Sequence, residues 1–241
     1  MAGAEINRSL LIEELDLGDD GSLSELHRDV FTPNFPADEL DDEATMATGL
    51  RSGTAMVSVA RAGSGDLLGG VVGEWFAASG VMLLSYIATR PGSRSGGVGT
   101  RLLTAAKASW SERHKPSLIV AEVEDPRYHD GVAYGEPWSR LRFYGRLGCR
   151  ALDLPYFQPA LGAGRRRVTN LLLMVVGGDA ADPAAASVDG GLVECFLVEY
   201  FELCEGPIAD GDLAATRMLA ACRAPGGLRL LPPGELPPAL G

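Results

Sequence analysis

Cations are scarce in this chain of 241 residues, and nearly all of them are arginines. Two lysines stand against nineteen arginines, and the formal net charge is −11. Binding to nucleic acid requires clustered cations that contact phosphate groups. The only basic run, Arg165-Arg166-Arg167, is typical of a solvated hairpin loop. We therefore expect no nucleic acid partner.

Long apolar runs and paired cysteines are also lacking. Glu5 and Arg8 interrupt the stretch that a secretory signal would need to be apolar, and the longest apolar runs have only the length of strands. The four cysteines have no paired metal-type spacing and stand at positions 149, 195, 204 and 222. We interpret them as reduced thiols and expect a cytoplasmic protein with no membrane contact and no metal.

The chain does contain enough apolar residues, 46%, to build a core from alternating strand and helix patterns. We expect strands over residues 8–16, 55–61, 67–76, 81–89, 117–124, 149–154 and 168–176. Helices are expected over residues 22–31, 38–50, 98–114 and 193–205, with one more around Tyr144. A further helix is expected to begin at Asp210 or Asp212 and to end at about residue 223. Ser22 and Asp38 are the expected N-caps of the first two helices. Short turns join the second, third and fourth strands, so these three should be antiparallel.

A glycine-rich turn follows the apolar strand at 81–89 and precedes a helix. The turn reads Arg94-Ser95-Gly96-Gly97-Val98-Gly99. Glycine lets the backbone approach an anion, and the first amides of a helix point at whatever lies in front of it. We therefore predict a phosphate site. A dinucleotide fingerprint fits less well because Leu102 stands where it needs a small residue, and a P-loop would need Gly-Lys-Ser/Thr, which is absent.

A second motif places a tyrosine four positions before a glycine. Tyr144 lies on a predicted helix, Gly148 ends that helix, and a strand begins at Cys149. Taken by itself, Tyr144 suits a core aromatic as well as a functional group.

These two segments resemble the recurrent motifs of the GNAT superfamily of N-acetyltransferases. The spacing Arg-x-x-Gly-x-Gly at 94–99 is similar to the family's pyrophosphate loop, and the resemblance covers roughly residues 8–176 in element order. It implies a mixed α/β fold with a mostly antiparallel central sheet of about seven strands and helices on both faces. It also implies acetyl-CoA, or a short acyl-CoA, as co-substrate and an amine as acceptor.

The resemblance assigns roles to residues of both motifs. The fourth strand would pair its backbone with the pantetheine arm of the coenzyme at Ile87, Ala88 and Thr89. Tyr144 would be the acid at the departing thiolate. The pyrophosphate would be bound by the loop residues Arg94, Ser95, Gly96, Gly97, Val98, Gly99 and Thr100.

The general base is open between several groups. Acyl transfer to an amine requires loss of a proton, a donor to the oxyanion and an acid at the leaving group. The backbone amide of Ala88 or Thr89 is the natural oxyanion donor. Glu122 and Glu124 lie two apart on the predicted fifth strand, and Glu74 stands in an apolar run where burial makes a carboxylate more basic. Ordered water is the remaining alternative.

The connector at 125–138 is long and carries three aromatic residues and a histidine. We predict that it is a substrate-side loop, with a plain surface insertion as the alternative. The candidate substrate-binding residues are Tyr128, His129, Trp138, Tyr156 and Phe157. The last two suit a core equally well. A loop of this kind favours a small-molecule amine as acceptor.

The chain is expected to divide into an acyltransferase domain at 1–177, a linker at 178–190 and a helical extension at 191–241. The extension's first helix has an acidic face and an apolar face, so it must be buried against the domain or against a second subunit of a homodimer. The alternative function keeps the fold without catalysis: a coenzyme-A-binding sensor or subunit-interaction module that uses this helix as its contact.

Overall fold

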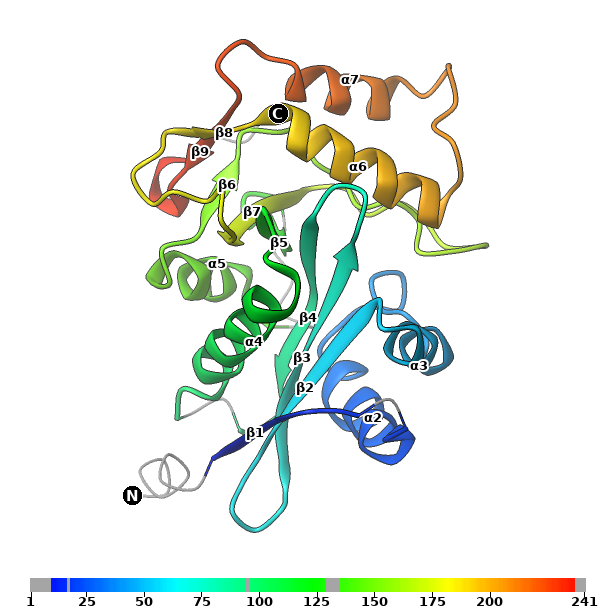
Figure 1. The fold of residues 1–241 in the computed structure, drawn as a ribbon, viewed down its shortest axis with the longest axis vertical. Coiled ribbons are helices and arrows are strands. Elements are labelled where there is room, and N and C mark those ends of the chain that lie inside the picture. Colours follow the sequence, from blue (N-terminus) through cyan, green and yellow to red (C-terminus); the bar gives the residue numbers. More distant parts are fainter. Residues whose placement is uncertain (1–9, 17, 94–95, 129–134, 237–241) are drawn as a thin grey trace. The chain divides into compact units, whose positions relative to one another are not determined.

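The computed structural model describes residues 10–16, 18–93, 96–128 and 135–236 (Figure 1). The chain divides into two compact units, one made of residues 1–75 with 83–114 and the other of 76–82 with 115–241. Within the described ranges, no helix has both the length and the apolar composition that crossing a bilayer would need.

The first unit is built on the strands β1 (Leu11–Glu14), β2 (Ala55–Arg61), β3 (Leu67–Phe76) and β4 (Val81–Thr89), which lie in this order. β2 pairs antiparallel with both β1 and β3. The bounds of β2, β3 and β4 are those predicted from the turn residues between them. The last residue of β3 and the first two of β4 belong, with their turn, to the second unit.

The helices of the first unit are α2 (Asp20–Leu26), which continues as a π-helical segment η1 (His27–Phe31), α3 (Glu43–Ser52) and α4 (Val98–His114). Gly53 ends α3 with a left-handed φ of 74°, as expected. The predicted N-caps Ser22 and Asp38 were wrong. Asp19 caps α2 by accepting from Ser22 N at 3.0 Å, and Asp42 caps α3. In both cases an aspartate at a different position satisfies the first-turn amides.

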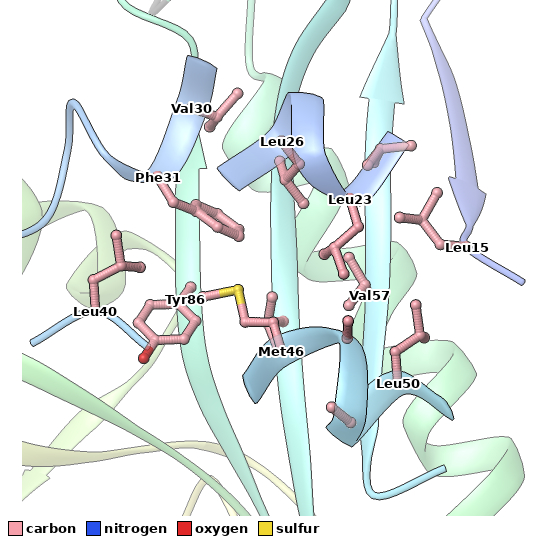
Figure 2. Close-up of a cluster of buried hydrophobic side chains, with 14 of the residues drawn as sticks. Leu15, Leu23, Leu26, Val30, Phe31, Leu40, Met46, Leu50, Val57 and Tyr86 are labelled. Atoms are coloured by element: carbon pink, nitrogen blue, oxygen red, sulfur yellow. The ribbon is translucent and has the colours of Figure 1, made fainter. Parts of the chain in front are cut away.

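Glycines on β3 allow helices to approach both faces of the strand. A Cβ at Gly70 would lie 2.4 Å from Leu26 Cδ1 of α2, and a Cβ at Gly73 would lie 2.4 Å from the Trp110 ring of α4. Successive residues of a strand face opposite sides, so α2 and α4 cover opposite faces of β3 (Figure 1). The α2 and α3 side buries a core that includes Phe31, Met46 and Tyr86 (Figure 2).

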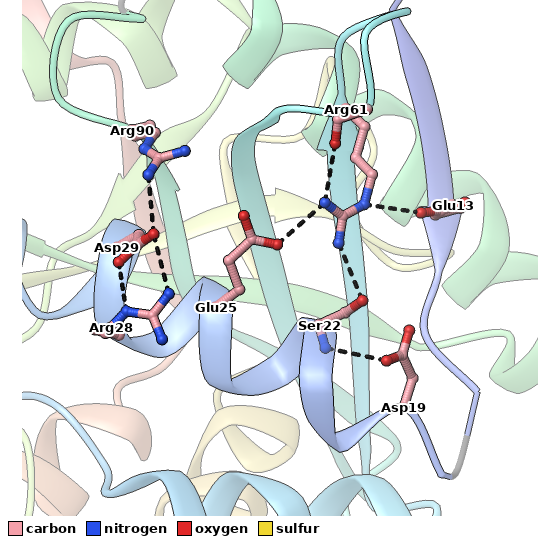
Figure 3. A network of polar contacts seen from close by, with 9 residues as sticks. Glu13, Asp19, Ser22, Glu25, Arg28, Asp29, Arg61 and Arg90 are labelled. Carbon is pink, nitrogen blue, oxygen red and sulfur yellow. Dashed lines mark hydrogen bonds and ion pairs between the residues drawn. The ribbon is translucent and has the colours of Figure 1, made fainter.

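A polar network holds the edge of the first unit. Arg61, at the end of β2, donates to Glu13 on β1 at 3.2 Å, to Glu25 on α2 at 3.1 Å and to Ser22 Oγ at 3.0 Å (Figure 3). A single guanidinium thus joins two strands to the helix that covers them.

The second unit contains β5 (Leu118–Glu124), β6 (Arg150–Leu152), β7 (Leu171–Gly177), β8 (Ser187–Val188) and β9 (Leu228–Leu231). Their order is β5-β7-β6-β9-β8, and every neighbouring pair is antiparallel. The helices are α5 (Pro137–Arg146), α6 (Gly190–Cys204), α7 (Leu213–Cys222) and the short 3₁₀ helix η2 (Pro233–Glu235).

The described residues thus form nine strands, where about seven were predicted. The two additional strands are β8, in the predicted linker, and β9, in the predicted extension. β9 pairs with β6 as well as with β8 and so extends the sheet. The predicted fold class, mixed α/β with a mostly antiparallel sheet, is confirmed.

The apolar face of α6 is buried within the second unit. Phe196 and Tyr200 contact Phe76 edge to face, with ring centroids 5.0 and 5.4 Å away. The carboxylate of Glu199 accepts from Ser79 N at 2.9 Å and from Ser79 Oγ at 2.7 Å, in the turn between β3 and β4. The carboxyl-terminal segment is therefore docked on its own chain.

Candidate functional site

The end of β4 is held in place by side chains of the first unit. Asn34 is buried and donates from Nδ2 to the carbonyl oxygens of Val30 at 2.6 Å and Thr89 at 3.2 Å. Arg90 donates to Asp29 at 2.9 Å (Figure 3). The predicted pantetheine-binding residues Ile87, Ala88 and Thr89 are half-buried. These contacts hold the end of β4, where the sequence predicted pairing with the pantetheine arm.

The beginning of α4 has the features expected of an anion site. Gly96 and Gly97 have left-handed φ angles of 97° and 71°, which side-chain-bearing residues rarely adopt. No described heavy atom lies within 4 Å of the position that a Cβ at Gly97 would take. The first turn of α4 contains no acidic residue. Since the first amides of a helix have no intrahelical acceptor, those of Val98, Gly99 and Thr100 can donate to a phosphate. These residues fit the pyrophosphate of coenzyme A.

Two members of the predicted loop, Arg94 and Ser95, lie outside the described residues. The predicted loop is therefore described only from Gly96 to Thr100.

Tyr144 lies near the end of α5 in the second unit. The helix ends in a Schellman motif, in which Gly148 N donates to Gly145 O at 3.0 Å and Cys149 N donates to Tyr144 O at 3.1 Å. Gly148 has a left-handed φ of 77°, as the sequence predicted. Burial raises the pKa of the Tyr144 hydroxyl well above its ordinary value, because the phenolate would lose its hydration. A tyrosine is already protonated near neutral pH at its ordinary pKa, and burial favours this form further.

Glu122 on β5 is the centre of a polar cluster in the second unit. Its carboxylate accepts from the Tyr156 hydroxyl, from Gln158 Nε2 at 2.7 Å and from the Tyr200 hydroxyl of α6 at 3.5 Å. Glu122 is half-buried, and the three donors are buried. Burial, followed by the charge of Glu122, raises the pKa of Tyr156. We refer to Glu122, Tyr156, Gln158 and Tyr200 as the Glu122 cluster.

The other two candidate bases have different surroundings. Glu124 forms an ion pair with Arg140 of α5 at 2.8 Å. Glu74 lies on β3 in the first unit, where it is half-buried and opposite Ala55. Glu122 thus accepts hydrogen bonds from neutral hydroxyl and amide groups, whereas Glu124 is paired with a cation.

Helix α6 contributes to the Glu122 cluster through Tyr200, which sequence reasoning did not predict. Tyr200 was predicted only as part of the buried face of its helix, and Gln158 was not singled out. Gln158 is placed by a two-residue bridge with Val168, in which Gln158 N donates to Val168 O at 2.9 Å. Neither residue carries a local sequence signal, because their partner lies 36 and 78 positions away.

Comparison with solved structures identifies the architecture. A protein from Bacteroides thetaiotaomicron assigned to the GNAT family of acetyltransferases matches with a TM-score of 0.55 and 22% identity, over 79% of this chain and 98% of that one. The chain has the GNAT fold. The ribosomal-protein-S18-alanine N-acetyltransferase of Escherichia coli matches with a TM-score of 0.50 and 14% identity, over 73% of this chain and 98% of that one.

A tandem GNAT protein from the clavulanic acid biosynthesis pathway is a third match to the GNAT fold. Its TM-score is 0.50 and its identity 17%, over 62% of this chain and 46% of that one. No family model and no curated protein matches the sequence. The similarity to these proteins is thus a similarity of fold, at sequence identities of 22%, 14% and 17%.

The predicted substrate-side residues of this GNAT fold fall into different surroundings. Tyr128 and Trp138 are exposed by 39% and 46%. His129 lies outside the described residues. Phe157 packs in the core, edge to face with Phe201 at 5.4 Å. Tyr156 contacts a candidate base, because its hydroxyl donates to Glu122.

Proposed function

We propose that this protein is an acyl-CoA-dependent N-acyltransferase that transfers a short acyl group, acetyl above all, to the primary amine of a small molecule. The observation that carries the proposal is the pair of left-handed glycines, Gly96 and Gly97, that immediately precede α4 within a GNAT fold. The long connector before α5 and the docked carboxyl-terminal helices favour an acceptor that enters a pocket.

Each catalytic requirement has a candidate group. Acetyl-CoA supplies an activated thioester when it is bound. The amides of Val98, Gly99 and Thr100 hold its pyrophosphate, and an amide of Ala88 or Thr89 donates to the oxyanion. Transfer by direct attack within a ternary complex then requires only that the amine lose a proton and that the thiolate gain a hydrogen bond or a proton.

We assign these two proton roles to Glu122 and Tyr144. The Glu122 carboxylate is half-buried on β5 and contacts Tyr156, one of the predicted substrate-side residues, so it is our candidate to take the proton of the amine. The Tyr144 hydroxyl carries a proton near neutral pH, as an ordinary tyrosine does, and burial raises its pKa further. Glu124 is less suited to the base role since it is paired with Arg140.

Release of free thiol from acetyl-CoA, measured over a panel of primary amines, tests the proposal. We expect turnover with at least one small amine and none without an amine. Coenzyme binding with no thiol release across a broad panel would contradict the proposal and favour a non-catalytic coenzyme-A sensor.

A further inference from the structure

The peptide group that joins Thr89 to Arg90, where β4 ends, is held by a hydrogen bond on each side. Its N–H, which belongs to Arg90, donates to Leu68 O of β3 at 2.8 Å. Its carbonyl oxygen, which belongs to Thr89, accepts from Asn34 Nδ2 at 3.2 Å. The C=O and the N–H of a planar trans peptide point in opposite directions, so these two bonds together fix the orientation of the group.

Asn34 can make this bond because it follows the π-helical segment η1. The carbonyl groups at the C-terminal end of a helix have no intrahelical donor. One of them is Val30 O, which accepts from Asn34 Nδ2 at 2.6 Å. The same Nδ2 thus donates to two carbonyl oxygens, and turning the amide round would place an acceptor oxygen against both. The orientation of this buried side chain is therefore fixed.

The segment that follows α2 is packed on β4. Phe31 and Phe35 lie with their ring centroids 5.6 and 5.3 Å from that of Tyr86 on β4. Asp29 of η1 pairs with Arg90, the residue after β4, at 2.9 Å (Figure 3). These contacts hold the donor side chain against the strand end to which it is bonded.

The preceding peptide group, between Ala88 and Thr89, shows which of their two amides is directed away from β3. A Cβ at Gly69 of β3 would lie 2.6 Å from Ala88 O, so this carbonyl is directed at β3. The N–H of the same peptide group belongs to Thr89 and points the opposite way. The N–H and C=O of one residue in a strand point to the same side, so the Ala88 N–H is directed at β3. A ligand bound along the other side of β4 would therefore meet the Thr89 amide.

We propose that the Thr89 N–H donates to the acyl carbonyl of the bound thioester, and that Asn34 is a positioning residue that acts on this amide through the Thr89 carbonyl. This inference rests on the proposed function and narrows its oxyanion donor from two amides to one. As the amine nitrogen bonds to the acyl carbon, the Thr89 N–H would stabilise the charge that develops on the carbonyl oxygen, until the C–S bond breaks and the charge leaves with the thiolate. A donor that is held in place beforehand stabilises such a charge best.

Acetyl-CoA and coenzyme A, which differ only by the acetyl group, test the choice of amide on the full-length protein. The amide signals of Thr89 and Ala88 are observed by NMR after labelling with ¹⁵N-threonine and ¹⁵N-alanine, and are identified by their loss in Thr89→Ser and Ala88→Gly. We expect the Thr89 amide proton to shift downfield when acetyl-CoA replaces coenzyme A, and the Ala88 signal to stay. A shift of Ala88 in place of Thr89, or of neither, would overturn the proposal.

Asn34→Leu tests the positioning role, because the variant removes the donor and keeps a branched side chain of similar shape. We expect kcat for thiol release to fall by about tenfold or more, with KM for acetyl-CoA unchanged within about threefold, since the lost stabilisation is specific to the transition state. The difference in Thr89 shift between acetyl-CoA and coenzyme A should also decrease. A residue with a purely structural role would lower the melting temperature without these two effects, and that result would refute the role of Asn34.

Thr32→Val is the matched control. Thr32 Oγ1 donates to His27 O at 2.9 Å, so the control removes a side-chain hydrogen bond within the same segment and not one to β4. Thr32 is exposed, and the kcat of this variant should stay within about twofold of that of the wild type. A tenfold loss in this control as well would show that any weakening of the segment lowers the rate, and would refute a specific role of Asn34.

Gly69→Ala carries the kinetic test if Asn34→Leu does not fold. Its Cβ would displace the Ala88 carbonyl and so turn the Thr89 amide from the opposite side, while Asn34 stays intact. We expect kcat to fall by about tenfold, again with KM for acetyl-CoA retained. An unchanged kcat in this variant would contradict the assignment of the Thr89 amide.

The outcomes separate this inference from the proposed function. Thiol release with an amine that does not depend on Asn34 would leave the acyltransferase standing and refute the positioning role. A Thr89 shift that is specific to acetyl-CoA and depends on Asn34, together with no thiol release over the amine panel, would leave the amide donor standing and refute the acyltransferase.

Discussion

Gly190, the first residue of α6, lies so close to Cys222 at the end of α7 that a Cβ at Gly190 would stand 1.8 Å from the Cys222 carbonyl oxygen. The two helices therefore meet backbone to backbone. The Cys222 carbonyl is a backbone group, so it cannot turn aside as a flexible side chain could.

Gly190→Ala should destabilise the protein by at least about 1–3 kcal/mol, the usual cost of overpacking, because the helices must separate to admit the methyl group. Urea unfolding measures the change. Gly211→Ala is the matched control, since no described atom lies within 4 Å of its Cβ position and its φ is not left-handed. A similar free energy of unfolding in the two variants would contradict the close approach.

Stability should fall when the solution becomes acidic, because His114 is held in its neutral form. Burial, followed by the charge of Arg113, lowers the pKa of His114 below the ordinary 6.5, and its ring stacks on Trp75 at 4.7 Å. The unfolded chain then binds a proton more readily than the folded one. The contribution is fully present above pH 6.5 and is lost as the pH falls towards the folded pKa.

Urea titrations of wild type and of His114→Phe between pH 5 and 8 isolate this term. We expect the free energy of unfolding of the wild type to decrease more steeply below about pH 6.5 than that of the variant, which keeps the ring and cannot titrate. Parallel curves would show that His114 contributes nothing to the pH dependence.

Substitution in the glycine loop should weaken the binding of coenzyme A without unfolding the protein. Gly97→Ala places a side chain at a φ of 71°, so the loop must either bear strain or rearrange away from the phosphate. We expect about tenfold weaker binding of coenzyme A by calorimetry.

Gly92→Ala is its control, because Gly92 has a comparable φ of 87° in the turn before the loop. The control should cost stability and leave the affinity for coenzyme A as it is. The same preparation also tests the dinucleotide alternative. Thermal protection by NAD and none by coenzyme A would reverse the assignment of the loop.

Tyr144→Phe should lower turnover on the order of tens of fold, because the variant loses the hydroxyl that we propose as the acid at the departing thiolate and keeps the ring. Its effect on the affinity for coenzyme A should be small. Steady-state rates and calorimetric binding measure the two effects separately. An unchanged rate would limit Tyr144 to a packing role, which its burial also permits.

Local signals predicted much of this fold. The strands at 55–61, 67–76 and 81–89 and the helix at 98–114 were found because glycine-rich turns and a clear helical period mark their ends. β8 and β9 were missed, since they have two and four residues and exist through pairing, such as Ser187 with Arg229, between distant parts of the chain. Short strands of this kind carry no period of their own.

The same distinction applies to the candidate site. Glu122 and Tyr156 were both singled out from the sequence, yet their contact spans 34 positions and no local pattern predicts it. The amphipathic pattern of α6 predicted that Tyr200 is buried, but it did not predict which residues Tyr200 packs against. Periodicity identifies a face of an element, whereas its neighbour is decided by tertiary packing.

Gly73 has no side chain, and this sets the distance between β3 and α4. The indole of Trp110 packs directly against the backbone of Gly73, with no side chain between them. A methyl group added at Gly73 would push α4 away from β3. The first turn of α4, which follows Gly97, would move with the helix. A residue within the sheet thereby fixes the position of the glycine turn at 96–97.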